Sequence, residues 1–292
     1  MAVGGFRWLT WWRALALVLG SCTAFALAPS AYADGVKFNS GDVLAALGNG
    51  TIGHFSPSGT LLDTLNTTSG SSEETGMCFD SAGNLYVTNF EANSMSKFDS
   101  NGNLVAASFG SGFNQDPESC AFNSSDQMYV GQADGLHKVL KFDTSGTLLK
   151  TYNPAPDDRG TDWIDLAADQ HTLHYTSEGT LVKTFDVSSN TQGPDFATGM
   201  PAPCYAHRIL PDGGELVACQ NEVVRLNASG AQVQTYPVDP SDNLFALNID
   251  PDGTSFWTAD FNGTVFHVDI ATGDVINSWS ANPVNDTSGL AV

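Results

Sequence analysis

Six residues of this 292-residue chain are of types suited to metal binding or to catalysis, and they lie at similar points of a repeated sequence pattern. They are Glu118, Asp162, Asp165, His207, Arg208 and Asn248. Carboxylate and amide oxygens are the ligands of a hard divalent cation such as Ca²⁺, so the three carboxylates and Asn248 are candidate metal ligands. His207, which can act as a base or a ligand, and Arg208 are candidate catalytic residues.

A purely structural role for the same residues is the alternative. Asp165 and Arg208 occupy the same position of neighbouring repeats and could neutralise each other, because buried charges are usually paired. His207 could be an interior histidine with satisfied hydrogen bonds. The sequence leaves both interpretations open.

The elements that must position these residues are repeats of about 43 residues. Similar stretches begin at residues 76, 119, 163, 206 and 246, and a further step of 43 residues reaches Gly289, where "GLAV" begins. Each unit contains four short apolar segments separated by Asp- and Gly-containing turns, such as "DSAGN" and "DPDG". Four short strands in 40–50 residues are typical of a β-propeller blade.

The first unit has only three of the four segments: "DVLAALG", "TIGHFSPSGT" and "LLDTL". We therefore predict that "GLAV" supplies its missing first strand, which would close the ring and leave no open sheet edge. The predicted fold is all-β: a six-bladed β-propeller over residues 34–292, with the first blade closed by the C-terminal strand.

Aligning the first strands predicts which residues face the ring centre. One row of equivalent positions combines small and polar residues: Cys78, Ala121, Asp165, Arg208, Asn248 and Ala291. The row just before the strands is predicted to form the rim of the central channel: Thr75, Glu118, Asp162, Tyr205, Phe245 and Ser288. The candidate residues are therefore expected to converge near one mouth of the channel.

Residues 1–33 read as a secretory signal peptide. Arg7 and Arg13 precede an apolar stretch too short to span a membrane comfortably, and "AYA" before Asp34 is a small-x-small cleavage pattern. Lipid attachment at Cys22 is a lesser alternative. The signal contains two of the 11 basic and none of the 32 acidic residues, so the net charge of −21 becomes −23 in the mature chain. Such a surface disfavours nucleic acid, and we expect a secreted monomer without stable membrane insertion.

The four cysteines that remain favour two disulfides in an exported chain. Cys78 and Cys120 lie on neighbouring first strands, one position apart in register, and are predicted to bridge two blades. Cys204 and Cys219 flank the "PDGG" hairpin of one blade and could pair across it, although their register is slightly off. Free thiols buried as small apolar groups are the alternative.

The stretch "GMCFDSAGNLYVTNF…SKFDSNGNL" resembles the NHL-repeat propellers, in particular an exported bacterial group. Related six-bladed gluconolactonase-type enzymes hold a metal with Glu, Asn and Asp, which by this resemblance implies Glu118, Asn248 and Asp165. Streptogramin-lyase-like propellers use His and Glu near the same mouth, and His207 is the histidine placed for that role. No P-loop, GxSxG, HExxH or CxxC motif is present.

These observations predict a secreted propeller that binds a protein or small-molecule ligand on one face of the ring. A metal-dependent hydrolase or lactonase with its site at the channel mouth is the alternative. A fold alone does not select between them, because propellers are rigid supports for many functions.

Overall fold

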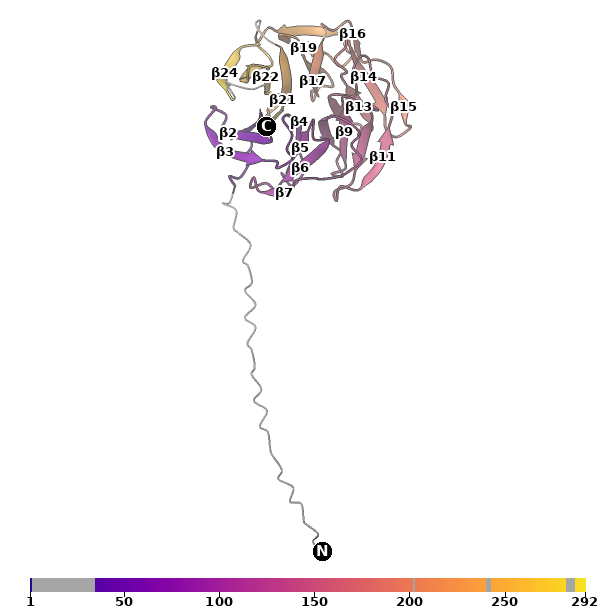
Figure 1. Cartoon of the computed structure of the whole chain (residues 1–292). Coiled ribbons are helices and arrows are strands. Elements are labelled where there is room, and N and C mark those ends of the chain that lie inside the picture. Colours follow the sequence, from indigo (N-terminus) through magenta and orange to yellow (C-terminus); the bar gives the residue numbers. More distant parts are fainter. Residues whose placement is uncertain (2–34, 202, 240–242, 282–286) are drawn as a thin grey trace. The chain divides into compact units, whose positions relative to one another are not determined.

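The computed structural model describes residue 1 and residues 35–201, 203–239, 243–281 and 287–292. The predicted signal peptide lies outside these residues, apart from Met1. Residues 35 onward belong to one compact unit, Tyr32–Val292. The described residues form 25 strands in six antiparallel sheets, which surround a centre where the C-terminus lies (Figure 1). This is the predicted six-bladed β-propeller.

Each blade runs from an inner to an outer strand. The inner strands are β25 (Leu290–Ala291), β4 (Glu74–Phe79), β8 (Pro117–Phe122), β12 (Ile164–Leu166), β17 (Cys204–Ile209) and β21 (Leu244–Ile249). The second strands are β1 (Val43–Gly48), β5 (Leu85–Asn89), β9 (Met128–Gln132), β13 (Thr172–Tyr175), β18 (Glu215–Cys219) and β22 (Ser255–Asp260).

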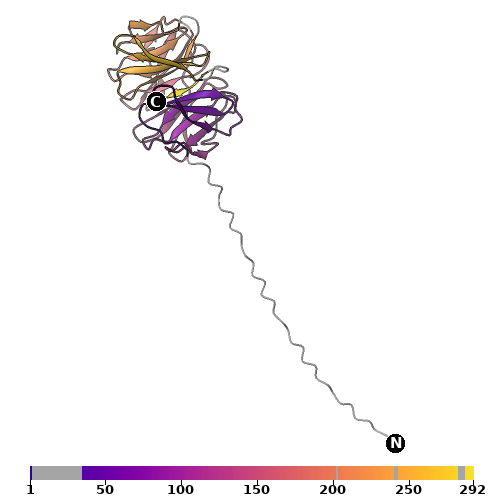
Figure 2. The ribbon, with the colours of Figure 1, turned by 90° about the vertical axis from the view of Figure 1, so that its left-hand side faces the viewer.

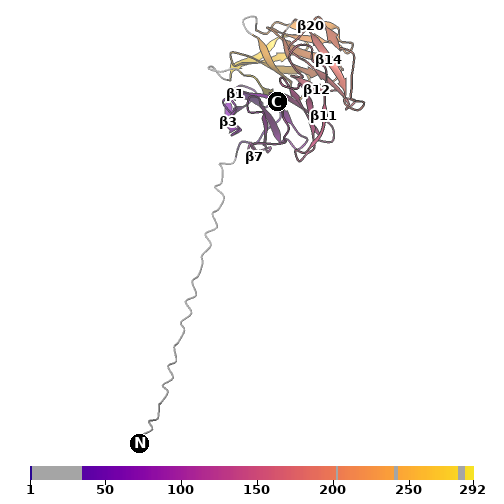
Figure 3. The same cartoon turned by 45° about the vertical axis from the view of Figure 1, so that its right-hand side comes forward.

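The third strands are β2 (Thr51–Phe55), β6 (Ser94–Phe98), β10 (Val139–Phe142), β14 (Leu181–Asp186), β19 (Glu222–Leu226) and β23 (Thr264–Asp269). The outer strands are β3 (Leu61–Asn66), β7 (Leu104–Ala106), β11 (Leu148–Tyr152), β15 (Thr191–Gln192) with β16 (Ala197–Thr198), β20 (Gln232–Tyr236) and β24 (Val275–Ser280). Figure 3 shows β3, β7 and β20 at the periphery and β12 near the central C-terminus. In blade 4 the outer strand is split, since β15 and β16 both pair with β14.

The C-terminal strand closes the first blade as predicted. Leu44 pairs with Ala291 and Ala45 with Leu290, while the amide of Ala46 donates to the carbonyl of Gly289 at 2.9 Å. Figure 2 shows the yellow C-terminal segment beside the indigo first strands. Leu290 and Ala291 are fully buried, so the closing strand is part of the core.

Asp-containing turns end the strands in a repeated way. In the turn after β6, Oδ1 of Asp99 accepts the amides of Asn101 and Asn103 at 2.9 Å each, and Gly102 has a φ of 77°. Glycine adopts this left-handed conformation without steric cost, which explains the recurring Asp-x-x-Gly pattern. The side chains of these aspartates are thus occupied in capping the backbone.

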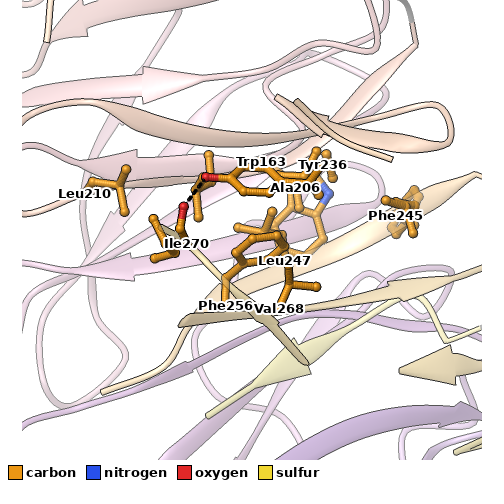
Figure 4. Packing of buried hydrophobic residues seen from close by; sticks show 13 residues of the cluster. Trp163, Ala206, Leu210, Tyr236, Phe245, Leu247, Phe256, Val268 and Ile270 are labelled. Atoms are coloured by element: carbon orange, nitrogen blue, oxygen red, sulfur yellow. Dashed lines mark hydrogen bonds between the residues drawn. The ribbon is translucent and has the colours of Figure 1, made fainter. Parts of the chain in front are cut away.

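The core consists of six apolar clusters, one in each seam, the interface between two neighbouring blades. In the seam between blades 5 and 6, for example, Tyr236 of blade 5 packs against Phe256 of blade 6, with 5.1 Å between the ring centres (Figure 4). The hydroxyl of Tyr236 donates to the carbonyl of Ile270 at 2.7 Å, which satisfies its polar end inside the cluster. Because every blade is packed on both sides, the closed ring is a rigid support.

Both predicted disulfides are present. Cys78–Cys120 joins blades 2 and 3, and Cys204–Cys219 joins β17 to β18 within blade 5. The second pair is slightly out of register along the sequence, as predicted, and an irregularity of the ladder brings the two cysteines together. The ladder shifts by one residue between Cys204 and His207, and this bulge puts Cys204 directly opposite Cys219.

Candidate functional site

The channel-mouth cavity, of about 220 Å³, lies where the inner strands of all six blades end. It contains the whole predicted row: Cys78, Ala121, Asp165, Arg208, Asn248 and Ala291. Its other lining residues are Met77, Phe79, Cys120, Phe122 and Val292. Blades 4, 5 and 6 contribute the polar wall, and blades 1, 2 and 3 contribute apolar side chains and the Cys78–Cys120 disulfide.

Arg208 is held at two of its three guanidinium nitrogens. Nε donates to Oδ1 of Asn248 at 3.1 Å, Nη1 donates to the carbonyl of His207 at 2.9 Å, and the guanidinium lies 5.6 Å from the ring centre of Trp163. Nη2 has no hydrogen-bond partner among the described residues. Burial lowers the pKa of Arg208 and the charge of Asp165 opposes this, yet an arginine remains cationic at any physiological pH.

Asp165 and Asn248 are engaged by other groups. The two carboxylate oxygens of Asp165 accept the backbone amides of Leu166 at 2.8 Å and Ile209 at 2.9 Å. The Nδ2 of Asn248 donates to the carbonyl of Leu290 at 3.1 Å, which ties blade 6 to the closing strand. The described ion pairs include no direct contact between Asp165 and Arg208, so the charge of Asp165 acts on the guanidinium through space.

Glu118 and Asp162 form a separate group, the inner carboxylate pair, which does not line the channel-mouth cavity. Both residues are buried, and Oε2 of Glu118 and both carboxylate oxygens of Asp162 have no hydrogen-bond partner. Burial raises the pKa of each well above its usual range. The negative charge of Glu178 adds to this in both residues, and that of Glu118 adds to it in Asp162, against the opposing charge of Arg159. The expectation that all candidate residues converge at one mouth therefore needs correction.

His207 lies in the seam between blades 4 and 5, in contact with a residue that the sequence analysis missed. Its Nδ1 is 3.0 Å from Oε2 of Glu215, and Nδ1 of His174 contacts the other oxygen, Oε1. Glu215 and His207 are fully buried, and His174 is nearly so. Burial alone would raise the pKa of Glu215, but the contacts with His174 and His207 outweigh it and lower the pKa to about 2.

We call His174, Glu215 and His207 the seam triad, because each replaces an apolar residue of the other blades. The row of His207 otherwise contains Met77, Cys120, Ile164, Leu247 and Leu290. The ladder positions of Glu215 in other blades are filled by Leu85, Met128, Leu173 and Phe256, and those of His174 by Leu44, Tyr86, Tyr129, Leu216 and Trp257. Aligning the second strands as well as the first would have found this signal.

The predicted metal ligands are only partly arranged for a cation. Among the described residues, no group of three or more His, Cys, Asp or Glu side chains is arranged to hold a metal ion. At the channel mouth, Asp165 and Asn248 are occupied and the cationic Arg208 lies beside them, so this half of the predicted ligand set does not fit. The inner carboxylate pair does offer unpartnered oxygens to a cation.

The described part of the chain contains no helix of the length and apolarity needed to span a membrane.

The class that fold and site define is a six-bladed β-propeller with an amphipathic cavity at its channel mouth. No protein-family model matches the sequence, and no curated protein matches it either. The NHL-type assignment of the repeats thus stays a prediction. Among solved structures, the chain is similar to one in the crystal structure of the nidogen/laminin complex, with a TM-score of 0.69 and 13% identity over 85% of this chain and 97% of that one. The match extends to 1610 solved chains in all, so the likeness shows the fold and selects no function.

Proposed function

We propose that this protein is an extracellular binding platform whose ligand is held at the channel mouth, without catalysis. One observation carries the proposal: all six blades line a cavity with a polar wall on one side and an apolar wall on the other. Ligand sites combine apolar surface with a few oriented polar groups, and this cavity contains both. The similar chain from the nidogen/laminin complex comes from an assembly of proteins, which accords with a binding role for this fold.

Two further features support an extracellular setting. The protein contains two disulfides, which persist in oxidising compartments, and its first residues have the pattern of a secretory signal. The strongly acidic composition keeps such a protein soluble and disfavours association with nucleic acid.

The binding-platform proposal is tested with benzyl alcohol, a neutral probe small enough for the cavity. The probe is titrated into the protein, and its binding is monitored by NMR. We expect saturable binding with a dissociation constant of about 1–10 mM, as its few atoms allow. Ala121→Phe, which fills the cavity from blade 3, should weaken binding at least about ten-fold. Circular dichroism checks that the variant is folded, and Ser145→Ala on an exposed turn is the control. Equal binding to wild type and a folded Ala121→Phe variant would contradict the proposal.

The alternative, a metal-dependent hydrolase, is favoured by one observation, the unpartnered oxygens of the inner carboxylate pair. A bound divalent cation would stabilise the folded state, so Ca²⁺ at ten times its dissociation constant should raise the free energy of unfolding by about 1.4 kcal/mol. The double variant Glu118→Gln, Asp162→Asn should lose this increment, whereas Asp165→Asn should keep it. If Ca²⁺, Mn²⁺ and Zn²⁺ all leave the unfolding curve of the wild type unchanged, the metal alternative is excluded.

A further inference from the structure

The polar wall of the channel-mouth cavity presents a hydrogen-bond donor with a positive charge. Nε and Nη1 of Arg208 are fixed by Asn248 and by the carbonyl of His207. Their contacts orient the planar guanidinium, and Nη2 is left as the donor available to a ligand. A pre-oriented guanidinium loses little side-chain entropy on binding and matches the geometry of a carboxylate.

The other polar groups of the wall do not compete for that role. Both oxygens of Asp165 accept backbone amides, and both ends of the Asn248 amide are engaged. A ligand amine near Asp165 would have to share the cavity with the guanidinium of Arg208, which makes no ion pair among the described residues and feels the charge of Asp165 only through space. The cavity is therefore better suited to an anionic group than to a cationic one.

The opposite wall is apolar. Phe79 and Phe122 line it together with the Cys78–Cys120 disulfide, from blades 2 and 3. Phe79 and Val292 also line a second cavity of about 420 Å³, which lies over the first blade and the turn after β4 and gives a longer ligand room to extend. A ligand with its anionic group at Arg208 could thus place its apolar part against Phe79 and Phe122, and a longer ligand could continue past Val292 into the second cavity.

We propose that the channel mouth binds an amphipathic carboxylate, with the carboxylate on the guanidinium of Arg208 and the apolar body against Phe79 and Phe122. This rests on the proposed function, since it names the ligand class of the same cavity. The shared chemistry is a carboxylate next to an apolar group, which a small organic acid and the C-terminus of a partner chain both offer.

The test compares three probes of one shape, benzoate, benzyl alcohol and benzylamine, by calorimetric or NMR titration of the full mature chain. A charge-assisted hydrogen bond in a cavity should make benzoate bind about ten- to a hundred-fold more tightly than benzyl alcohol, with benzylamine the weakest. Arg208→Gln should remove this preference while changing the affinity for benzyl alcohol less than about three-fold. Asp165→Asn, which removes a negative charge from the same wall, should tighten benzoate binding.

One more variant and one more probe distinguish the possible results of this experiment. Arg208→Lys retains the charge without the planar fork and should fall between wild type and Arg208→Gln, which covers the case that the glutamine variant fails to fold. N-acetylphenylalanine mimics a chain terminus, and tighter binding of it than of its amide and of benzoate assigns the carboxylate to a partner chain. Equal affinities for all three shape-matched probes would overturn the carboxylate proposal and leave the platform intact, and preference for benzylamine would overturn it as well. Failure of every probe to bind would overturn both.

Discussion

Replacing Glu215 alone by leucine is expected to lower the free energy of unfolding by about 2–4 kcal/mol, although leucine stands at the same position of blades 2 and 4. The substitution would leave Nδ1 of two buried histidines without the carboxylate that accepts their N–H groups. The triple variant His174→Leu, Glu215→Leu, His207→Met recreates the apolar seam between blades 1 and 2, where Leu44, Leu85 and Met77 take these positions. It should recover most or all of the loss, because well-packed apolar groups are often as stable as a buried ionic cluster.

Urea unfolding at neutral pH with the disulfides intact measures this difference in the free energy of unfolding. The same measurement repeated at acidic pH gives a second test. The pKa of Glu215 is lowered from 4.5 to about 2, so its contribution is complete above about pH 4.5 and is lost as the pH falls towards 2. The wild type should lose stability over this range more steeply than the triple variant. If the single and triple variants were equally unstable, the triad would not be acting as a unit.

Removing the closing strand is the second change with a large expected effect. Deleting residues 290–292 takes away the fully buried Leu290 and Ala291, together with their pairing to Ala45 and Leu44. Burial of one leucine and one alanine with two backbone hydrogen bonds is worth about 4 kcal/mol. The deletion should therefore lower the free energy of unfolding by at least about that amount and expose β1 as an open, aggregation-prone edge.

Deletion of Val292 alone is the matched control, because this residue is only partly buried and pairs with no described strand. Its unfolding curve should stay close to that of the wild type, while the three-residue deletion should also scatter light at moderate concentration. The deletion removes Ala291 from the channel-mouth cavity and the carbonyl that accepts the amide of Asn248. Undiminished stability after the three-residue deletion would refute the role of ring closure.

The repeat period predicted the architecture because every blade must bury the same positions against its neighbours. Counting steps of about 43 residues placed the closing strand correctly, and aligning the first strands identified the row that lines the channel mouth. The Cys78–Cys120 disulfide was predicted from the same alignment, and the Cys204–Cys219 disulfide from two cysteines that flank one hairpin. The β-bulge before His207 was not, since a single extra residue in one strand leaves no mark in an apolar pattern.

The candidate site was predicted less completely than the fold, because sequence periodicity determines the positions of residues but not the contacts between their side chains. By itself, the sequence determined the blade number, the ring closure and the residues at equivalent positions, because these follow from periodic burial. Only the tertiary structure decided which charged atoms meet: it separated the Glu118–Asp162 pair from Asp165, Arg208 and Asn248, and brought Glu215 between two histidines. Several of these contacts depend on side chains that reach across the seams between blades, as His174 does to Glu215, 41 positions away along the chain.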